Sequence, residues 1–373
     1  MYYKNAVSKN KSTYFLVYDN FGLIFTDFDS LLKLYINSGF FIMSEIYSGH
    51  LSRSDKMFEF LRWEIFSRMG CNCRDGIRVF STNGSNAVYV YEDCKSNCRV
   101  VGKFFRSVRQ SDWSIAEKHL ERELRNINTF SQYIGKQHYV ARVLGRNDSL
   151  NCLLVIEYCT GEALDNIIIR SINEKNENLL FLKLTALAYF LATAHNRSAR
   201  GRGIDFSVQC NYFSTLLCGI EDVSSRHERD LLWNMCLSWK NDVSVWQDQE
   251  VLVHGDATPS NFLFGDGLYV IAFDMERVRY TDRCFDLGRL AAELQHFFLR
   301  TTGNKYAAEK FIGHFLWEYC CHFPDRTSAF DAICRRIPFY MGLNLLRIAR
   351  NRYLDTSYRQ LLKNEAFLTL NKG

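Results

Sequence analysis

Proline is scarce in this sequence, with three residues in a chain of 373. Long proline-rich linkers are therefore excluded. The chain also lacks a run of about 18 apolar residues, so we expect no transmembrane segment. Its opening stretch, MYYKNAVSKN, lacks the apolar core of a secretory signal peptide. Together these absences predict a cytoplasmic protein.

Cysteine is abundant, but the spacings typical of metal-binding cysteines are missing. None of the thirteen cysteines forms a C-x-x-C pair, and Cys94 and Cys98 are four apart without a nearby His. A structural zinc site is therefore not expected. In a reducing cytoplasm the cysteines should be thiols, most of them buried as small apolar side chains.

The charges are nearly balanced, with a net charge of +5. A nucleic-acid-binding face needs Lys and Arg gathered together, whereas here they are spread among acids, so we expect no nucleic acid partner. Apolar residues make up 47% and aromatic residues 15% of the chain. That composition argues against disorder and suffices for one large or two moderate domains.

Residues 1–75 show no recognisable chemistry, and we interpret them as an accessory N-terminal segment. STYFLVYD at 12–19 is typical of a strand, and the stretch 30–40 predicts a helix that stops near Gly39. Residues 54–69 have the apolar spacing of an amphipathic helix.

From residue 76 the sequence predicts a small, strand-rich lobe that ends at residue 160. Its strands are expected at 77–80, 87–93, 98–105 and 152–158, with one helix at 113–134. Residues 161–373 predict a larger, mainly helical lobe, interrupted by a short hairpin within 250–274. The fold class is therefore α+β and bilobal, with ligands expected between the lobes. The helices of the larger lobe are predicted at 178–196, 206–222, 226–240, 284–302, 305–322 and 327–352.

The segment VHGDATPSNFLFGDGLYVIAFDME at 253–276 carries the clearest chemistry. Phosphoryl transfer needs a carboxylate that takes or orients the proton of the attacking hydroxyl, and oxygen ligands that hold Mg²⁺ against a triphosphate. Asp256 and, five residues later, Asn261 can supply both. The hairpin after Asn261 would bring Asp274 back beside it. The spacing therefore predicts one site containing all three residues.

These residues also carry a family resemblance. HGDATPSN resembles the catalytic loop of the aminoglycoside phosphotransferase / choline kinase group, a branch of the protein-kinase-like fold. Protein kinases have Arg between His and Asp, whereas this chain has Gly255, as in the small-molecule branch. Asp274-Met-Glu276 is similar to the D-x-E of that branch, and CFDLGRLAAEL at 284–294 is similar to the start of its D-L-x-R-L helix.

The resemblance implies an enzyme that uses ATP, or another nucleoside triphosphate, and Mg²⁺ to phosphorylate a hydroxyl of a small molecule. It implies that Asp256 is the catalytic base and that Asn261 and Asp274 are the metal ligands. Three more residues have supporting roles by the same resemblance: Glu276 at the metal site, and His254 and Asp286 as braces of the catalytic loop.

Lys103 lies among apolar residues in the expected strand VVGKFF, where an unpaired charge is costly. By resemblance it holds the nucleotide phosphates and pairs with a helix carboxylate. Glu123 shares a helical face with Leu120 and Ile127, whereas Glu121 projects away, so we expect Glu123 to be the partner. The alternative for Lys103 is a lysine that protects a sheet edge against aggregation. The alternative for Glu123 is an ordinary solvated acid of a helix.

The resemblance also implies two further nucleotide contacts, by position in the chain. The turn at 81–87 stands where a glycine-rich phosphate loop belongs, although it offers only Gly84 and neighbours such as Ser85. The strand at 152–158 would lead into the hinge between the lobes, so the backbone of Glu157 and Cys159 is expected to meet the adenine.

The charge of the C-terminal part of the chain bears on the phosphate acceptor. Residues 301–373 contain eleven Lys and Arg against six Asp and Glu. A polycationic antibiotic would be repelled by such a surface, which favours a neutral or anionic acceptor such as a sugar, a phosphorylated metabolite or a glycolipid head group. Two alternatives remain: a pseudokinase scaffold, which would need none of these residues, and a protein kinase, which would need a longer segment between Asp274 and Asp286.

Overall fold

The computed structural model describes residues 7–9, 12–19, 22–27, 45–82, 87–107, 110–136 and 138–371. The chain divides into two compact units, Met1–Glu45 and Ile46–Gly373. The described part of the first unit is an antiparallel sheet in the order β1-β2-β3. The strand predicted at 12–19 is confirmed, whereas the helix predicted at 30–40 lies outside the described residues. The strands are β1 (Val7–Lys9), β2 (Ser12–Asp19) and β3 (Gly22–Asp27).

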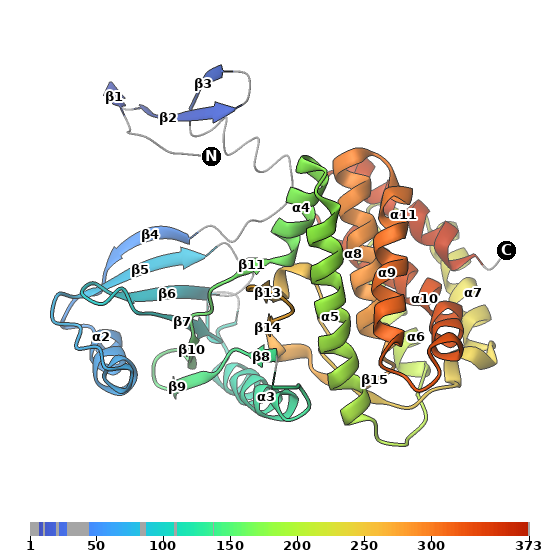
Figure 1. Ribbon diagram of the computed structural model, residues 1–373, viewed down its shortest axis with the longest axis horizontal. Helices are drawn as coiled ribbons and strands as arrows, with labels where there is room; N and C mark the ends of the chain where they lie inside the picture. Colours follow the sequence, from blue (N-terminus) through green and yellow to red (C-terminus); the bar gives the residue numbers. More distant parts are fainter. Residues whose placement is uncertain are drawn as a thin grey trace. The chain divides into compact units, whose positions relative to one another are not determined.

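The second unit begins with a six-stranded sheet in the order β4-β5-β6-β7-β10-β9 (Figure 1). The strands at 77–82, 87–93, 99–104 and 153–157 were predicted, and their pairings are antiparallel. β4 and β9 were not predicted, because both are short and lack a clear alternation of apolar and polar residues. The strands are β4 (Glu45–His50), β5 (Ile77–Thr82), β6 (Ala87–Asp93), β7 (Arg99–Phe104), β9 (Val143–Asn147) and β10 (Leu153–Glu157).

Residues 46–75 belong to this lobe, so the predicted accessory segment ends too late in the chain. The predicted amphipathic helix is α2 (Lys56–Phe60), continued by a π-helical turn over 61–65 and a 3-10 turn over 66–69. Its apolar side bears Phe58 and Phe66, which are buried in one cluster with the sheet residues Val100 and Val155. Burial against the sheet makes this segment part of the lobe's core.

Helix α3 (Trp113–Ser131) begins where Asp112 caps its first turn, because the Asp112 carboxylate accepts a hydrogen bond from the backbone of Ile115 at 3.1 Å. Its buried side carries Leu120, Glu123 and Ile127, as the 3.6-residue period predicted. Glu123 is the charged member of that buried side.

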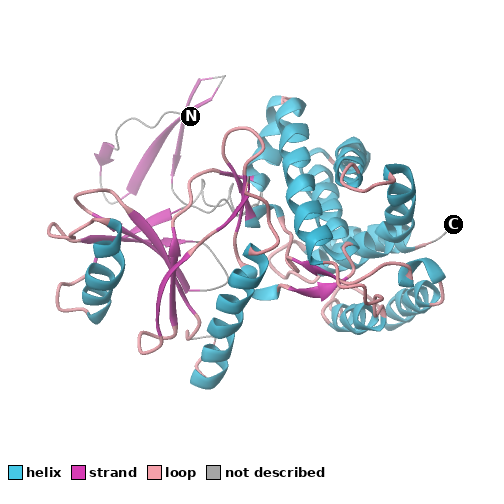
Figure 2. Cartoon of the chain, turned by 60° about the horizontal axis from the view of Figure 1, so that its bottom comes forward, coloured by secondary structure: helices cyan, strands magenta, loops and turns pink. Residues whose placement is uncertain are grey.

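The larger lobe is mainly helical, and Figure 2 shows that helices make up most of it. The predicted helices are confirmed with small shifts at their ends, while α4 and α11 were missed. Helices α8 and α10 pack closely: a Cβ at Gly288 would collide with Tyr340. The helices are α4 (Leu164–Glu174), α5 (Glu177–Ser198), α6 (Ser207–Cys218), α7 (Arg226–Lys240), α8 (Cys284–Thr302), α9 (Glu309–Cys320), α10 (Arg326–Ala349) and α11 (Thr356–Leu370).

Helix α5 is the core helix of this lobe. Within the described part of the chain it is the one helix long and apolar enough to cross a membrane, but 61% of the relevant window is buried inside the structure. It packs against α4, α9 and the strand before the catalytic loop. Its polar Lys183 caps the turn of the predicted hairpin, donating hydrogen bonds to the carbonyls of Gly265 and Gly267 at 2.8 and 2.9 Å.

Two small sheets position the segment 250–281. One has the order β11-β13-β14-β8, in which β14 and β8 are parallel, and the other pairs β12 with β15. The hairpin predicted within 250–274 is the pair β13 and β14. Strand β10 ends at Glu157 and strand β11 begins at Glu162, on either side of the predicted lobe boundary. The strands are β8 (His138–Val140), β11 (Glu162–Ala163), β12 (Val251–Val253), β13 (Phe262–Phe264), β14 (Val270–Ala272) and β15 (Arg279–Thr281).

Candidate active site

The hairpin brings the predicted metal ligands to one end of the two strands. Phe262 pairs with Ala272, and the Phe273 amide donates to the Asn261 carbonyl at 3.3 Å, so Asp274 follows directly beside Asn261. Asp274 itself has a left-handed backbone, with φ of 61°. A non-glycine residue in that region costs free energy, and such residues occur at active sites as well as in turns.

The Asp256 carboxylate is 16% exposed and lies between two arginines. Its Oδ1 forms an ion pair with Arg289 Nη1, and its Oδ2 lies 3.5 Å from Arg277 Nε. Burial alone would raise the pKa of Asp256, but the positive charges of Arg289, Arg347 and Arg277 outweigh it and hold the pKa below its usual range. Asp256 therefore stays ionised at neutral pH.

Glycine is required between His254 and Asp256. Gly255 has φ of 78°, and a Cβ there would overlap the carbonyl oxygen of Arg277. The close approach places Arg277 against the catalytic loop, which gives a physical reason for Gly at a position where protein kinases have Arg.

Asp286 and His254 hold the loop around Asp256 by hydrogen bonds. The buried Asp286 carboxylate accepts hydrogen bonds from the backbone of His254 at 2.7 Å and of Gly255 at 2.9 Å. His254 Nδ1 accepts from the Asp256 amide at 3.3 Å, and its Nε2 contacts the Phe273 carbonyl at 3.0 Å. One histidine thus ties the catalytic loop to the strand that leads to Asp274.

His195 is fully buried and lies 3.3 Å from Asp286 Oδ2. Its other ring nitrogen lies 3.0 Å from the Tyr319 hydroxyl. It supports the brace from behind and does not reach the surface of the site.

Lys103 lies among three carboxylates. Its Nζ is 2.7 Å from Glu123 Oε2, 2.7 Å from Asp274 Oδ1 and 3.8 Å from Glu276 Oε2, so the expected pair with Glu123 is present. Burial opposes the charge of Lys103, but Glu123 and Asp274 raise its pKa above the ordinary value. Burial, with further repulsion from Asp274, raises the pKa of Glu123 to about 7 against the opposing effect of Lys103.

Glu121, the rejected partner, instead lies on the exposed side of α3 and pairs with Arg146 at 3.0 Å. The turn after Asp274 is tied to α3 by Asn126, whose side chain donates to the Met275 carbonyl at 2.7 Å. The helix that carries Glu123 therefore contacts both Lys103 and the turn that carries Asp274.

The donor set near the hairpin end suits Mg²⁺, which prefers carboxylate and amide oxygens. Carboxylate oxygens of Glu123, Asp274 and Glu276 lie within 4.8 Å of one another. Asn261 donates its side-chain NH₂ to the Asp256 carbonyl at 2.8 Å. Its Oδ1 accepts no hydrogen bond from the described residues, so that oxygen is available to a metal ion.

The predicted adenine contacts lie in the backbone of Glu157 and Cys159. The Glu157 N–H donates a hydrogen bond to the Arg142 carbonyl at 3.0 Å. The Glu157 carboxylate accepts a hydrogen bond from the Arg142 backbone and forms an ion pair with its guanidinium group. The Glu157 N–H is therefore not available to a nucleotide. The amide of Cys159 donates no hydrogen bond within the described chain. Gly84 and Ser85 lie outside the described residues.

Besides Arg277, three residues of this site were not assigned from the sequence. Arg289, on α8, donates to the Gly255 carbonyl and to Asn344 Oδ1, both at 2.9 Å. Asn344 also accepts from Arg347 Nε at 3.3 Å. The signal for Arg289 was present, because it follows Asp286 by three residues and shares its helical face. For Asn344 and Arg347, near the end of α10, the sequence offered no signal.

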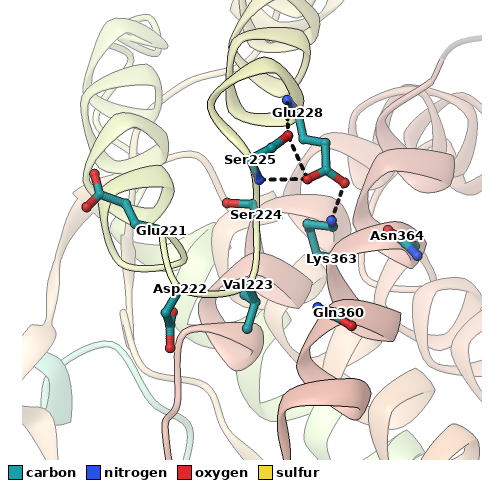
Figure 3. A pocket seen from close by; sticks show the side chains of 9 residues that line it. All are labelled: Glu221, Asp222, Val223, Ser224, Ser225, Glu228, Gln360, Lys363 and Asn364. Atoms are coloured by element: carbon teal, nitrogen blue, oxygen red, sulfur yellow. Dashed lines mark hydrogen bonds and ion pairs between the residues drawn. The ribbon is translucent and has the colours of Figure 1, made fainter.

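A surface pocket of about 460 Å³ lies away from these residues, between α11 and the segment 221–228 (Figure 3). Its polar groups bind one another: Ser225 and Glu228 form a capping box at the start of α7, and Lys363 pairs with Glu228. It brings together none of the predicted site residues.

The fold and the geometry around Asp256 define a kinase-like phosphotransferase, with an antiparallel sheet lobe followed by a helical lobe that carries the catalytic loop. The chain belongs to the phosphotransferase enzyme family (APH), whose pattern it matches over residues 76–320. A search of the curated proteins found no significant match.

Solved structures support the same fold. The chain is similar to an ethanolamine kinase of Plasmodium vivax, with a TM-score of 0.54, 15% identity and coverage of 92% of this chain and 91% of that one. It is also similar to a macrolide 2'-phosphotransferase type I, with a TM-score of 0.51, 14% identity and coverage of 87% and 100%. For a streptomycin–ATP complex of APH(2")-IIa the values are 0.50, 13%, 85% and 97%.

Proposed function

We propose that this protein transfers the γ-phosphate of ATP, or of another nucleoside triphosphate, to a hydroxyl of a small molecule. Family membership supports phosphotransferase activity. Among the similar structures, one contains ATP with streptomycin and another contains GDP with kanamycin. Those ligands belong to those proteins, and the acceptor of this chain is argued from its own residues.

Asp256 is the residue that we assign to the acceptor hydroxyl. In the reaction the hydroxyl oxygen bonds to the γ-phosphorus, the bond from that phosphorus to the β–γ bridging oxygen breaks, and ADP leaves. The hydroxyl proton passes to Asp256. Because its pKa is held low, Asp256 is a weak base, and it acts mainly by orienting the hydroxyl for in-line attack. Phosphoryl transfer suits such a residue, since positioning dominates its catalysis.

Lys103 is the proposed phosphate-binding cation, held in place by Glu123. Its raised pKa keeps the ammonium charged, and Glu123 fixes its direction from a buried position. Mg²⁺ would be held by Asn261 and Asp274, with Glu276 beside them, and would neutralise charge on the phosphates. The Cys159 amide remains available for the base of the nucleotide.

One observation carries the proposal. Three segments that are distant in sequence place Lys103, Asp256 and Asp274 in a connected network, with Lys103 on Asp274 and His254 joining the Asp256 loop to Phe273. A scaffold without catalysis needs none of these contacts.

The thirteen cysteines are all free, which supports the proposed cytoplasmic location.

Consumption of ATP with Mg²⁺ tests the proposal, using a panel of sugars, amino alcohols, nucleosides and antibiotics as acceptors. We expect acceptor-dependent release of ADP that is lost in Asp256→Ala. An exposed acid on α3, Glu117, gives the matched control Glu117→Ala, which should keep the activity. Nucleotide binding without acceptor-dependent turnover, equal in wild type and Asp256→Ala, would instead indicate a pseudokinase.

A further inference from the structure

Asp256 interacts electrostatically with four arginines, Arg277, Arg279, Arg289 and Arg347. Two of the nearby arginines are tightly paired: Arg289 with Asp256, and Arg347 with Glu293. Two others remain, Arg277 and Arg279, which follow Asp274 closely in the chain. They are brought to Asp256 by the 3-10 turn over 275–277 and by the strand that follows it.

Arg277 is only loosely held. Its Nε lies 3.5 Å from Asp256 Oδ2 and 3.5 Å from Glu276 Oε1, which is long for a charge-assisted hydrogen bond. Its Nη1 and Nη2 form no hydrogen bond with any described residue. The side chain is 43% exposed, so these donors are open to a ligand beside the catalytic carboxylate.

Arg279 has no carboxylate partner among the described residues. Its guanidinium stacks on the ring of Phe285, 4.3 Å from the ring centroid, and its Nε is buried without a hydrogen-bond acceptor. Burial lowers the pKa of Arg279. A guanidinium group still keeps its charge at neutral pH. Asp286 and Asp256 attract it, but neither accepts a hydrogen bond from its buried Nε.

Tyr212, on α6, adds a neutral donor to the same place. Its hydroxyl is buried without a hydrogen-bond partner in the described chain, and its ring lies 6.1 Å from Phe285. It is close enough to interact electrostatically with Arg277, Arg279, Arg289 and Arg347. Arg277, Arg279 and Tyr212 thus offer unused hydrogen-bond donors on one side of the proposed base.

We propose that the phosphate acceptor carries an anionic group, a carboxylate or a phosphate, which Arg277, Arg279 and Tyr212 bind while Asp256 orients the acceptor hydroxyl. This inference rests on the proposed function. Binding of the anion gives an acceptor to the open Arg277 donors and to the buried Arg279 Nε and Tyr212 hydroxyl. A cationic amino sugar would instead meet repulsion at this position.

Matched acceptors that share one carbon skeleton test the charge preference: glucose, glucosamine, gluconate and glucose 6-phosphate, each with Mg²⁺ and ATP. We expect kcat/KM for an anionic form to exceed the neutral form at least tenfold, and gluconate against glucose 6-phosphate distinguishes the two anions. Arg277→Gln should raise the KM for the anionic acceptor by about 10- to 100-fold and leave the KM for ATP alone. Arg335→Gln, at an exposed arginine on α10, is the control and should keep the preference.

A second measurement does not depend on finding an acceptor. Inorganic phosphate and malonate are titrated calorimetrically into the protein loaded with Mg²⁺ and ADP. We expect binding that is lost in Arg277→Gln/Arg279→Gln and kept in Arg335→Gln.

Either of two results would overturn the inference. One is anion binding of equal strength in the wild type, in Arg277→Gln/Arg279→Gln and in Arg335→Gln. The other is a preferred acceptor that is neutral or cationic. A fall in kcat of equal size for every acceptor in Arg277→Gln would also overturn it, because Arg277 would then act on the transferred phosphoryl group. Failure of the proposed function has a different signature, namely no ATP consumption dependent on Asp256 with any acceptor, whatever the anion titrations give.

Discussion

Replacing Lys103 by Met tests the group of three carboxylates around this lysine. Met keeps the apolar length of the side chain but removes the charge that lies 2.7 Å from both Glu123 and Asp274. The Lys103 side chain is 8% exposed and that of Glu123 is 2% exposed, so the change leaves a buried carboxylate beside other acids. Removing one partner of a buried ion pair costs about 3–5 kcal/mol.

The loss should depend on pH in a defined direction. With Lys103 present, the pKa of Glu123 is already about 7, and without it the pKa must rise further. A carboxyl whose pKa is higher in the folded state than in the unfolded state gains protons on folding, so its stability contribution falls as the pH rises through the folded pKa. Lys103→Met should therefore cost less stability at pH 6 than at pH 8.

Urea unfolding followed by tryptophan fluorescence measures these differences at the two pH values. The double variant Lys103→Met/Glu123→Gln removes the buried charge and should recover a large part of the loss at pH 8. The exposed Lys118 on α3 provides the control Lys118→Met, with a change within about 0.5 kcal/mol. A loss at pH 8 below about 1 kcal/mol, or a double variant no more stable than the single one, would refute the argument.

Three other changes test the catalytic loop. Gly255→Ala should have a larger relative effect on kcat than on the free energy of unfolding, because its Cβ displaces the Arg277 carbonyl. The control is an Ala substitution at the exposed Gly303. A kcat that is unchanged in Gly255→Ala would contradict the argument. Asn261→Ala should weaken nucleotide binding in Mg²⁺ but not in EDTA, as measured by calorimetry; equal weakening in both would remove Asn261 from the metal site. Arg289→Gln removes the main charge that lowers the pKa of Asp256, so the acid limb of the kcat/KM profile should move to higher pH, and an unmoved limb would contradict the pairing.

The parts of the site that the sequence predicted are those determined by local geometry. The spacing from Asp256 to Asn261 lies within one loop, and the turn at 265–267 returns Asp274 to it. The choice of Glu123 over Glu121 needed only the 100° step of a helix. Each of these depends on a few neighbouring residues, so a single sequence contains the information.

The unpredicted parts depend on tertiary packing. Arg289 meets Asp256 because α8 packs behind the catalytic loop, and Asn344 joins it only because α10 packs on α8. The hydrogen bond from the Glu157 amide to the Arg142 carbonyl likewise joins β10 to the residue before β9. Helix α11 was missed although Asp355 caps it, since its apolar residues follow the helical period poorly. The fold class was confirmed because it depends on the order of elements and not on these contacts.

The inclusion of β4 and α2 in the sheet lobe has a practical consequence for truncation. The family match starts at residue 76, and a chain cut there would lose the edge strand of the sheet. It would also uncover the apolar face on which Phe58, Leu61 and Phe66 are now buried. An exposed apolar face beside an unpaired strand favours aggregation. A shortened protein intended for crystallisation or kinetics should therefore begin near Ile46, where the compact unit begins.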